Sequence, residues 1–413
     1  MAVPKLRFKA DDGSDYPNLE ETKLDTLMAF KNGINASGDK FRRGTKCISV
    51  MDILNNSCIT YDVIKGEVDV DEKTLQNFTV EYGDAVFQRS SENVQDAGRA
   101  NVYMDKDRPA TFSGFVIRGK RIANYEPMFM NGLLNTFSVR KQIMSKAQGA
   151  QHINIGQEIL SSVRVNMPSL PEQQKIAEFL STIDTVIEKQ KGTVVAWEER
   201  RKGVMQKLFS QEVRFKADDG SDFPEWEEKK LGEVFKISTE TNGDRYSKQE
   251  VLSVSDEYGV VNQIELQGRS FAGNDISKYK VVKTGQLIYT RSPLATKPFG
   301  IIKIVDEKIG IVSPLYIVND VRENNCSMFW YYNFDTPERT NNYLKPLVRM
   351  GAKHTMNISN EEWLSGRVLS PCLAEQQKIA DCISSMDEVI GKQKATLAAW
   401  EELKKGLLQQ MFV

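Results

Sequence analysis

A long internal repeat constrains the fold of this chain more than any other feature of its sequence. Residues 7–24 read RFKADDGSDYPNLEETKL and residues 214–231 read RFKADDGSDFPEWEEKKL, so that 14 of 18 positions are identical. A second pair of blocks, residues 170–209 and 373–412, matches at 23 of 40 positions. Repeats of this length decide an architecture, because each copy repeats one structural unit. The sequence therefore predicts two copies of one scaffold, each made of a short segment, a variable region and a long block.

The 40-residue blocks have the pattern of long coiled-coil helices. Each block follows a proline, and apolar residues recur every seven positions along two lines. Because both copies lie in one chain, we expect the two helices to pack antiparallel, with internal pseudo-twofold symmetry. A helix of about 39 residues spans roughly 58 Å at ~1.5 Å per residue, which exceeds one turn of B-DNA, about 34 Å. The predicted helix seam includes Ile183, Ile187, Gln190, Trp197, Met386, Ile390, Gln393 and Trp400.

Polar residues interrupt this seam at matching places in the two blocks. Gln190 and Gln393 share one position, and Arg201 and Lys404 share another. Two interpretations stay open at this point. The seam is locally hydrated, or the paired glutamines fix the register of the helices at a cost in stability.

The variable regions, roughly 25–165 and 232–368, are predicted to be α+β. Short apolar runs such as Ala85–Phe87 and Gly300–Val305 are bounded by Gly, Pro, Asn and Asp, as β-strands are. Ser327 to Phe334 fits one amphipathic helix. Weak echoes connect the two regions, since GDAVFQRS from Gly83 parallels GQLIYTRS from Gly285, and GAQH from Gly149 parallels GAKH from Gly351. Two copies of one scaffold thus carry different insertions.

The distribution of charge along the chain changes what the net charge indicates. With 55 basic and 56 acidic residues the net charge is −1, which at face value argues against nucleic-acid binding. The repeated segments are acidic, however, whereas Arg108 to Gln148 and Gly268 to Lys303 each carry seven basic residues and one acid. Basic clusters repeated in both regions suit phosphate binding, and interleaved Arg, Ser, Asn and His side chains suit the reading of base edges. For any single Lys or Arg, an ordinary solvated surface remains the alternative.

The candidate DNA-binding residues come from these clusters and from the matched echoes. They are Arg89, Ser90, Arg118, Lys120, Arg121, Arg140, Lys141, Lys146, His152, Asn154, Arg269, Lys278, Arg291, Ser292, Lys297, Arg349, Lys353, His354 and Asn357.

Several classes of protein are disfavoured by the sequence. No stretch of 18 apolar residues occurs, and Met1 to Asp12 contains no apolar signal core, so no membrane passage is expected. The five cysteines form no CxxC pair, which is typical of reduced, cytoplasmic thiols and of neither disulfides nor a zinc site. No P-loop and no Gly-rich methyl-donor motif is present. We therefore expect a non-enzyme with no catalytic residue, no metal site and no cofactor of its own.

Two variable domains, each followed by a nearly copied helix that begins EQQKIA and ends near AWEE, resemble the specificity subunit of type I restriction–modification systems. The resemblance covers the whole chain and includes the RFKADDGSDYP and RFKADDGSDFP segments, which look like joints between domains and helices. It implies an N-terminal joint (1–24), a first target recognition domain (25–169), a central spacer helix (170–210), a repeated joint (211–231), a second recognition domain (232–369) and a C-terminal spacer helix (370–413).

The resemblance also implies a function and partners. Each recognition domain is expected to read one half of a bipartite, asymmetric target in double-stranded DNA, with the helices setting the gap. The partners would be two modification subunits, which bind S-adenosylmethionine and methylate adenine at N6, and two restriction subunits, which use ATP and Mg. The helix starts are expected to face outward and dock these partners, through Glu172, Gln173, Gln174, Lys175 and their counterparts Glu375, Gln376, Gln377 and Lys378.

Two alternatives belong to other classes. The first is a coiled-coil adaptor whose two domains bind proteins, with the basic patches facing acidic partners. The second is a self-sufficient methyltransferase, which the missing motifs disfavour.

Overall fold

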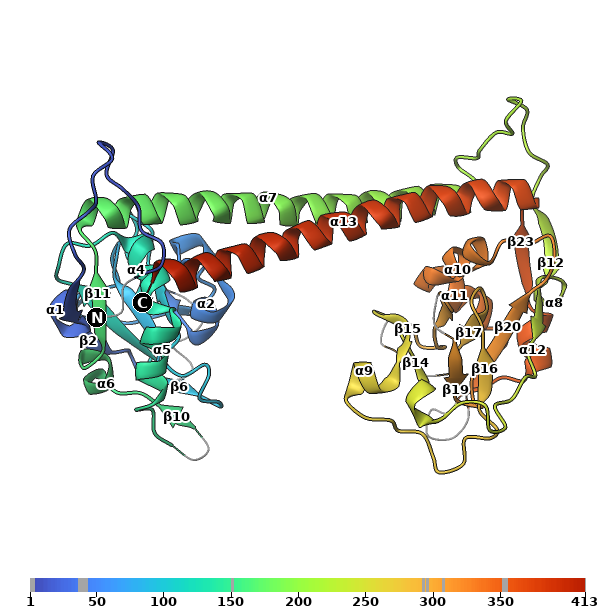
Figure 1. Ribbon diagram of the computed structural model, residues 1–413, viewed down its shortest axis with the longest axis horizontal. Coiled ribbons are helices and arrows are strands. Elements are labelled where there is room, and N and C mark those ends of the chain that lie inside the picture. Colours follow the sequence, from blue (N-terminus) through green and yellow to red (C-terminus); the bar gives the residue numbers. More distant parts are fainter. Residues whose placement is uncertain are drawn as a thin grey trace. The chain divides into compact units, whose positions relative to one another are not determined.

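The computed structural model shows two compact units, which are described separately here (Figure 1). Unit 1 comprises Met1–Gly192 and Lys394–Val413, and unit 2 comprises Thr193–Gln393. Each unit therefore contains part of both long helices, α7 (Leu170–Phe209) and α13 (Leu373–Met411). The structure describes residues 4–35, 44–149, 152–291, 294, 297–306, 309–350 and 356–412.

The shorter elements of the two units follow one another in nearly the same order. In unit 1 they are β1 (Glu20–Lys23), α1 (Leu24–Leu27), β2 (Met28–Asn32), β3 (Thr45–Ile48), α2 (Val50–Asn55), η2 (Tyr61–Val63), β4 (Glu67–Val68), α3 (Glu72–Asn77), β5 (Ala85–Gln88), β6 (Ser90–Ser91), β7 (Ala100–Val102), β8 (Thr111–Phe112), β9 (Val116–Arg121), α4 (Pro127–Leu134), α5 (Phe137–Met144), β10 (Ile153–Asn154), α6 (Gln157–Ser161) and β11 (Arg164–Met167). In unit 2 they are β12 (Glu227–Lys230), α8 (Leu231–Val234), β13 (Phe235–Ile237), η3 (Lys248–Glu250), β14 (Leu252–Ser255), β15 (Gly259–Asn262), α9 (Gln263–Gln267), β16 (Lys280–Val282), β17 (Leu287–Tyr289), β18 (Ile302–Ile304), β19 (Gly310–Val312), β20 (Ile317–Val321), α10 (Ser327–Asp335), α11 (Pro337–Leu344), β21 (Arg349–Met350), β22 (Met356–Asn357), α12 (Asn360–Ser365) and β23 (Arg367–Ser370).

A four-stranded antiparallel sheet forms the centre of each unit. Its strand order is β2–β9–β5–β7 in unit 1 and β13–β20–β17–β18 in unit 2. The registers also correspond, because Phe87 lies opposite Ile117 in unit 1 and Tyr289 lies opposite Ile317 in unit 2. The α+β class and the two similar domains expected from the repeat are therefore confirmed.

The central strands are buried on both faces, which explains their uninterrupted apolar sequences. In β17, Leu287 and Tyr289 belong to the larger core that packs on the helices, whereas Ile288 belongs to a second core on the opposite face. Successive side chains of a strand point to opposite faces, so a strand between two cores needs apolar residues at every position. A glycine with positive φ precedes each central strand, at Gly83 (φ 87°) and Gly285 (φ 85°). Left-handed backbone of this kind favours glycine, which accounts for the matching echo in the sequence.

The long helices α7 and α13 pack antiparallel in both units. In unit 1 the first part of α7 meets the last part of α13, and Lys404 donates to Asp184. In unit 2 the last part of α7 meets the first part of α13, and Arg201 donates to Asp387. The polar seam position shared by Arg201 and Lys404 is thus occupied by equivalent ion pairs between the helices. The antiparallel arrangement predicted from the heptads is confirmed.

The predicted seam positions lie on the packed sides of the helices. Gln190 and Gln393 are half-buried, and whether they fix the register stays a prediction. Four apolar seam residues are buried, namely Ile183, Ile187, Met386 and Ile390, whereas Trp197 and Trp400 are half-buried.

The repeated acidic segments are bound to the starts of the long helices by buried ion pairs. In unit 1, Nε and Nη2 of Arg7 donate to both carboxylate oxygens of Glu172, at 3.0 and 2.6 Å. In unit 2, Arg214 makes the same two bonds to Glu375, at 3.1 and 2.9 Å. The Glu172 and Glu375 side chains are 1% and 0% exposed. These ion pairs attach each repeated segment to the start of a long helix, and the assignment of the segments as joints, which the resemblance implies, stays a prediction.

The prediction that the helix starts face outward is wrong for four of the eight residues concerned. Besides the two glutamates, Gln173 and Gln376 are buried. Gln376 accepts a bond from the backbone N–H of Cys326 at 2.8 Å, and Gln173 makes the equivalent bond to Glu126 at 3.0 Å. Each glutamine thereby ties a helix start to the α+β domain of its own unit. The first two residues of each EQQK sequence therefore serve internal bonding, whereas the second glutamine, Gln174 or Gln377, is exposed.

We predict that Arg214→Ala destabilises unit 2 by about 3–5 kcal/mol, because it leaves the buried Glu375 carboxylate without its cation. Arg367→Ala is the matched control. Its partner Glu228 is exposed, and loss of such a surface pair costs less than about 1 kcal/mol. Hydrogen–deuterium exchange of Leu373 to Ile383 in increasing urea measures the difference. Equal effects of the two substitutions would contradict a structural role for the buried pair.

Candidate nucleic-acid interface

Two candidate sites that lie far apart in the sequence come together in unit 1. Strand β6 pairs with β10, which places Ser90 opposite Asn154 and Ser91 opposite Ile153. The Ser90 hydroxyl is hydrogen-bonded to Oδ1 of Asn154. We call the paired strands β6 and β10 with His152 the unit 1 hairpin surface; both strands are labelled at the same end of unit 1 in Figure 1. The Arg89–Ser90 and His152–Asn154 echoes therefore form one surface rather than two.

Two side chains of the unit 1 hairpin surface are exposed, whereas Ser91 is buried. His152 and Asn154 are exposed, and Asn154 Nδ2 donates only to the His152 carbonyl, at 3.0 Å. Arg89 is half-buried and donates to the Gly114 carbonyl at 3.2 Å. An exposed amide whose bonds are local retains donors and acceptors for a base edge.

In unit 2, strands β21 and β22 place Arg349 opposite Asn357, which corresponds to the bridge between Gln148 and Asn154 in unit 1. The Arg349 side chain is 83% exposed and pairs with Glu362 at 3.1 Å. Arg291, at the end of the central strand, is half-buried, and its Nε has no hydrogen-bond partner among the described residues. The other candidates at this end, Ser292, Lys353 and His354, lie outside the described residues.

The remaining unit 2 candidates lie apart from this hairpin in sequence. Lys278 is exposed, and the exposed Arg269 guanidinium lies 4.6 Å from the centre of the Phe271 ring. Phe271 is itself 56% exposed. It was not predicted as a candidate, although an aromatic residue two positions after an arginine in a glycine-bounded loop is a signal that the sequence offers. Stacking of bases on such rings is common in nucleic-acid binding.

Several candidate cations point into the protein instead of toward solvent. Arg118 is 7% exposed and donates to the Thr79 carbonyl, and burial lowers its pKa. Lys297 is 6% exposed and bound to Asp256 at 2.6 Å. Arg121 donates to the Tyr125 carbonyl at 2.6 Å. These cations are held by the fold, so we leave them out of the proposed contact surface.

Other candidates in unit 1 remain accessible or belong elsewhere. Lys120 pairs with Glu81 at 3.4 Å, and the exposed Lys146 donates to the Ser162 hydroxyl at 2.7 Å. Lys141 is exposed on α5. Arg140 is buried and lines a cavity between α5 and α13. Basic residues that cluster in the sequence are therefore divided between surface and interior.

The type I restriction modification DNA specificity domain family matches this chain at residues 50–195 and 224–399, which make up more than half of its length. The chain belongs to this family. It is 24% identical over 435 residues to the putative type I restriction enzyme MjaX specificity subunit of Methanocaldococcus jannaschii, covering 97% of this chain and 94% of the relative. It is also 24% identical over 277 residues to the MjaVIII specificity subunit of the same organism, covering 64% of each chain.

Solved structures with a similar fold include the S subunit of a type I restriction–modification system from M. genitalium. The TM-score is 0.55 at 14% identity, over 100% of this chain and 99% of that chain. A second similar chain comes from a structural study of complex assembly and conformational transition of the type I R-M system. Its TM-score is 0.51 at 14% identity, over 96% of this chain and 97% of that chain. These similarities agree with the fold described above.

As a type I specificity subunit, this chain is the DNA-recognition subunit of a restriction–modification complex and carries two recognition domains. Subunits of this kind are non-catalytic and assemble with other subunits and DNA. No helix in the described part of the chain is both long enough and apolar enough to cross a membrane.

We predict that Asn154→Ala weakens binding of the assembled complex to its target by about 1–3 kcal/mol, the range for a lost bidentate base contact. Asn77→Ala is the matched control, because Asn77 is another exposed asparagine of unit 1 bonded to a nearby carbonyl, that of Lys73. Fluorescence anisotropy on the duplex identified by methylome sequencing gives the affinities. A loss that is equal in the two variants, or absent in Asn154→Ala, would contradict the assignment.

Proposed function

We propose that each unit reads one half of a bipartite, asymmetric sequence in double-stranded DNA. The observation that carries this proposal is one short strand pairing repeated in both units, in which an asparagine faces a glutamine in unit 1 and an arginine in unit 2. In unit 1 a bridge joins Gln148 to Asn154, and the corresponding hairpin of unit 2 pairs Arg349 with Asn357. Equal frames that present different donors and acceptors suit two different half-sites.

In this proposal α7 and α13 set the length of the gap between the half-sites. Each helix is continuous and contributes to both units, and the ion pairs of Asp184 and Asp387 hold the two helices in one register. A protein that binds two half-sites through a rigid spacer imposes its own geometry on their spacing.

The partners of this chain are part of the same proposal. Two modification subunits that bind S-adenosylmethionine methylate adenine at N6, and two restriction subunits that use ATP and Mg join them in the cytoplasm. Methylation of a base requires its extrusion from the stack, so the recognition domains must also hold a distorted duplex. Because the helix starts are internally bonded, we place partner docking on other faces of the helices, such as the exposed Gln174 and Gln377.

A gel-shift experiment with the assembled complex tests recognition directly. We expect a shift of random-sequence DNA whose affinity falls steeply with salt, because neutralised phosphates release counterions. The same complex without this chain serves as the control. Absence of a shift with every subunit present would contradict DNA recognition and favour a protein-binding adaptor.

A further inference from the structure

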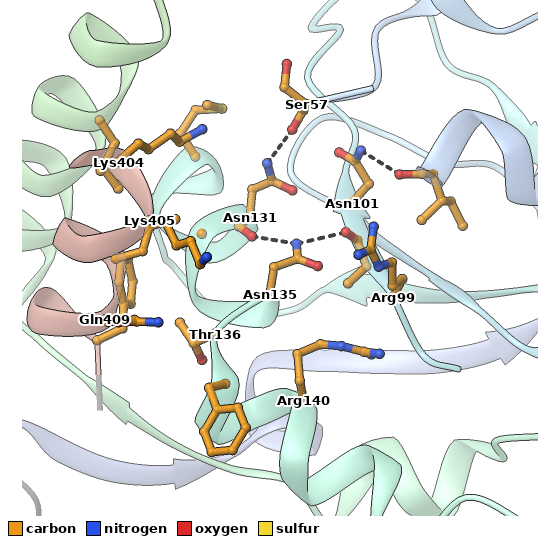
Figure 2. A pocket seen from close by; sticks show the side chains of 18 of the residues that line it. Ser57, Arg99, Asn101, Asn131, Asn135, Thr136, Arg140, Lys404, Lys405 and Gln409 are labelled. Carbon is orange, nitrogen blue, oxygen red and sulfur yellow. Dashed lines mark hydrogen bonds between the residues drawn. The ribbon is translucent and has the colours of Figure 1, made fainter. Parts of the chain in front are cut away.

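A cavity of about 960 Å³ opens in unit 1 where the recognition domain meets the long helices (Figure 2). Helices α4 and α5 form one wall, and Lys404, Lys405 and Gln409 enter from α13. Figure 2 places Arg99 and Arg140 across the cavity from these residues. Sites for small ligands have volumes of roughly 300–1,000 Å³, so the space is large enough for one.

The equivalent place in unit 2 is occupied by side chains. Helices α4–α5 and α10–α11 correspond, since Phe129 stacks on Phe412 as Phe329 packs on Phe209. Asn131, Gly132 and Asn135 stand in unit 1 where Tyr331, Tyr332 and Asp335 stand in unit 2.

Two of these unit 2 residues, Tyr332 and Asp335, are bonded to the long helices. Tyr332 donates to Asp387 at 2.8 Å, and Asp335 pairs with Arg201 at 3.5 Å. At these three positions unit 2 has two aromatic rings and a carboxylate, whereas unit 1 has a glycine and two amides. The two units therefore differ in the residues at the place where the cavity lies in unit 1.

Arg140 brings an incompletely bonded cation to this cavity. Its side chain is 8% exposed, and Nη2 donates to the Gln95 carbonyl at 2.7 Å. Its Nη1 is buried without a hydrogen-bond partner among the described residues. Burial and repulsion from Arg99 lower the Arg140 pKa to about 10. Burying a charge is costly unless it is paired and hydrogen-bonded, so an anion beside Arg140 would compensate its charge.

The other charged groups of the cavity leave the arginine side positive. Arg99 has Asp96 as its carboxylate partner, at 3.5 Å, and its side chain is 51% exposed. On the helix side, Asp184 is paired with Lys404, and Glu401 lies 3.8 Å from Lys191. The acids of the long helices thus have cations of their own.

The rim supplies a flat apolar surface beside these cations. Phe137 lines the cavity and is 71% exposed. An aromatic ring this exposed offers a face for stacking a base or another flat ring. The Gln409 amide and the Oδ1 of Asn135, whose Nδ2 donates to the Ala100 and Asn131 carbonyls, can bond the polar edges of such a ring.

We propose that this cavity binds a free nucleoside phosphate, with the phosphate between Arg99 and Arg140 and the base against Phe137. Phosphate could also reach these arginines from the DNA backbone, so the experiment separates the two sources. The site goes beyond DNA recognition, because it would let a small metabolite act on the specificity subunit.

Calorimetric titration of the full chain with AMP and with inorganic phosphate tests the proposal. We expect AMP to bind more tightly than phosphate, and Arg99→Gln to weaken both at least tenfold. Phe137→Ala should weaken AMP binding alone, since only the base contacts the ring. Arg164→Gln is the matched control, because Arg164 is a similarly exposed arginine of unit 1 with one carboxylate partner, Glu21. Both Arg99 and Phe137 are exposed, so their substitution leaves the core of the unit intact.

A competition arm with target duplex and the assembled complex identifies the source of the phosphate. Retained AMP binding in the presence of duplex, with unchanged DNA affinity of Arg99→Gln, supports a free nucleotide. Displacement of AMP by duplex, together with weaker DNA binding of Arg99→Gln, would overturn the proposal and make the cavity a DNA contact. Absence of AMP binding, or equal loss in Arg164→Gln, would also overturn it, whereas DNA recognition by the complex is read independently.

Discussion

The buried pairing of an arginine with a helix-start glutamate is the interaction on which each unit depends. Arg7 and Glu172 join the N-terminal segment to α7, and Arg214 and Glu375 join the central segment to α13. A buried carboxylate is tolerated only with such a partner, so each joint must be docked for its helix to begin where it does. In unit 1 the same segment also meets the end of α13, where the Leu6 N–H donates to the Gln410 carbonyl at 3.0 Å.

This joint separates the parts of the chain that must be constant from those that vary. The repeated segments and the helix starts match closely in sequence and the central sheet repeats in topology, whereas most other residues of the two units differ. Stability therefore resides in buried groups shared by both copies, and we propose that recognition resides in exposed groups. The net charge of −1 reflects the same division, because acidic joints and basic recognition regions cancel in the sum.

Much of the fold could be predicted because its signals are local and periodic. The heptads predicted α7 and α13, the run before Phe87 predicted β5, and Ser327 to Phe334 was correctly assigned to one helix, α10. The contact residues of the candidate site were harder to predict, because the burial of a side chain depends on strand pairing between segments far apart in the sequence. Arg118 looks like a surface base in the sequence, yet β9 places it in the interior beside Asp84.

Other features depend on partners that no local pattern specifies. Ser90 and Asn154 meet only because β6 pairs with β10, 64 residues later. The buried glutamates of EQQK were expected at the surface because their arginine partners lie more than 160 residues away. The cavity beside Arg140 was not predicted at all, since it arises from Gly132 and Asn135 standing where unit 2 has a ring and a carboxylate.

Exchange of residues 25–165 for the corresponding region of another specificity subunit, followed by methylome sequencing, tests the account most directly. If each unit reads its own half-site, the methylated sequence changes in one half only, while the other half and the gap between them stay the same. A change in both halves, or a different gap with both halves retained, would contradict the assignment of one half-site to each unit.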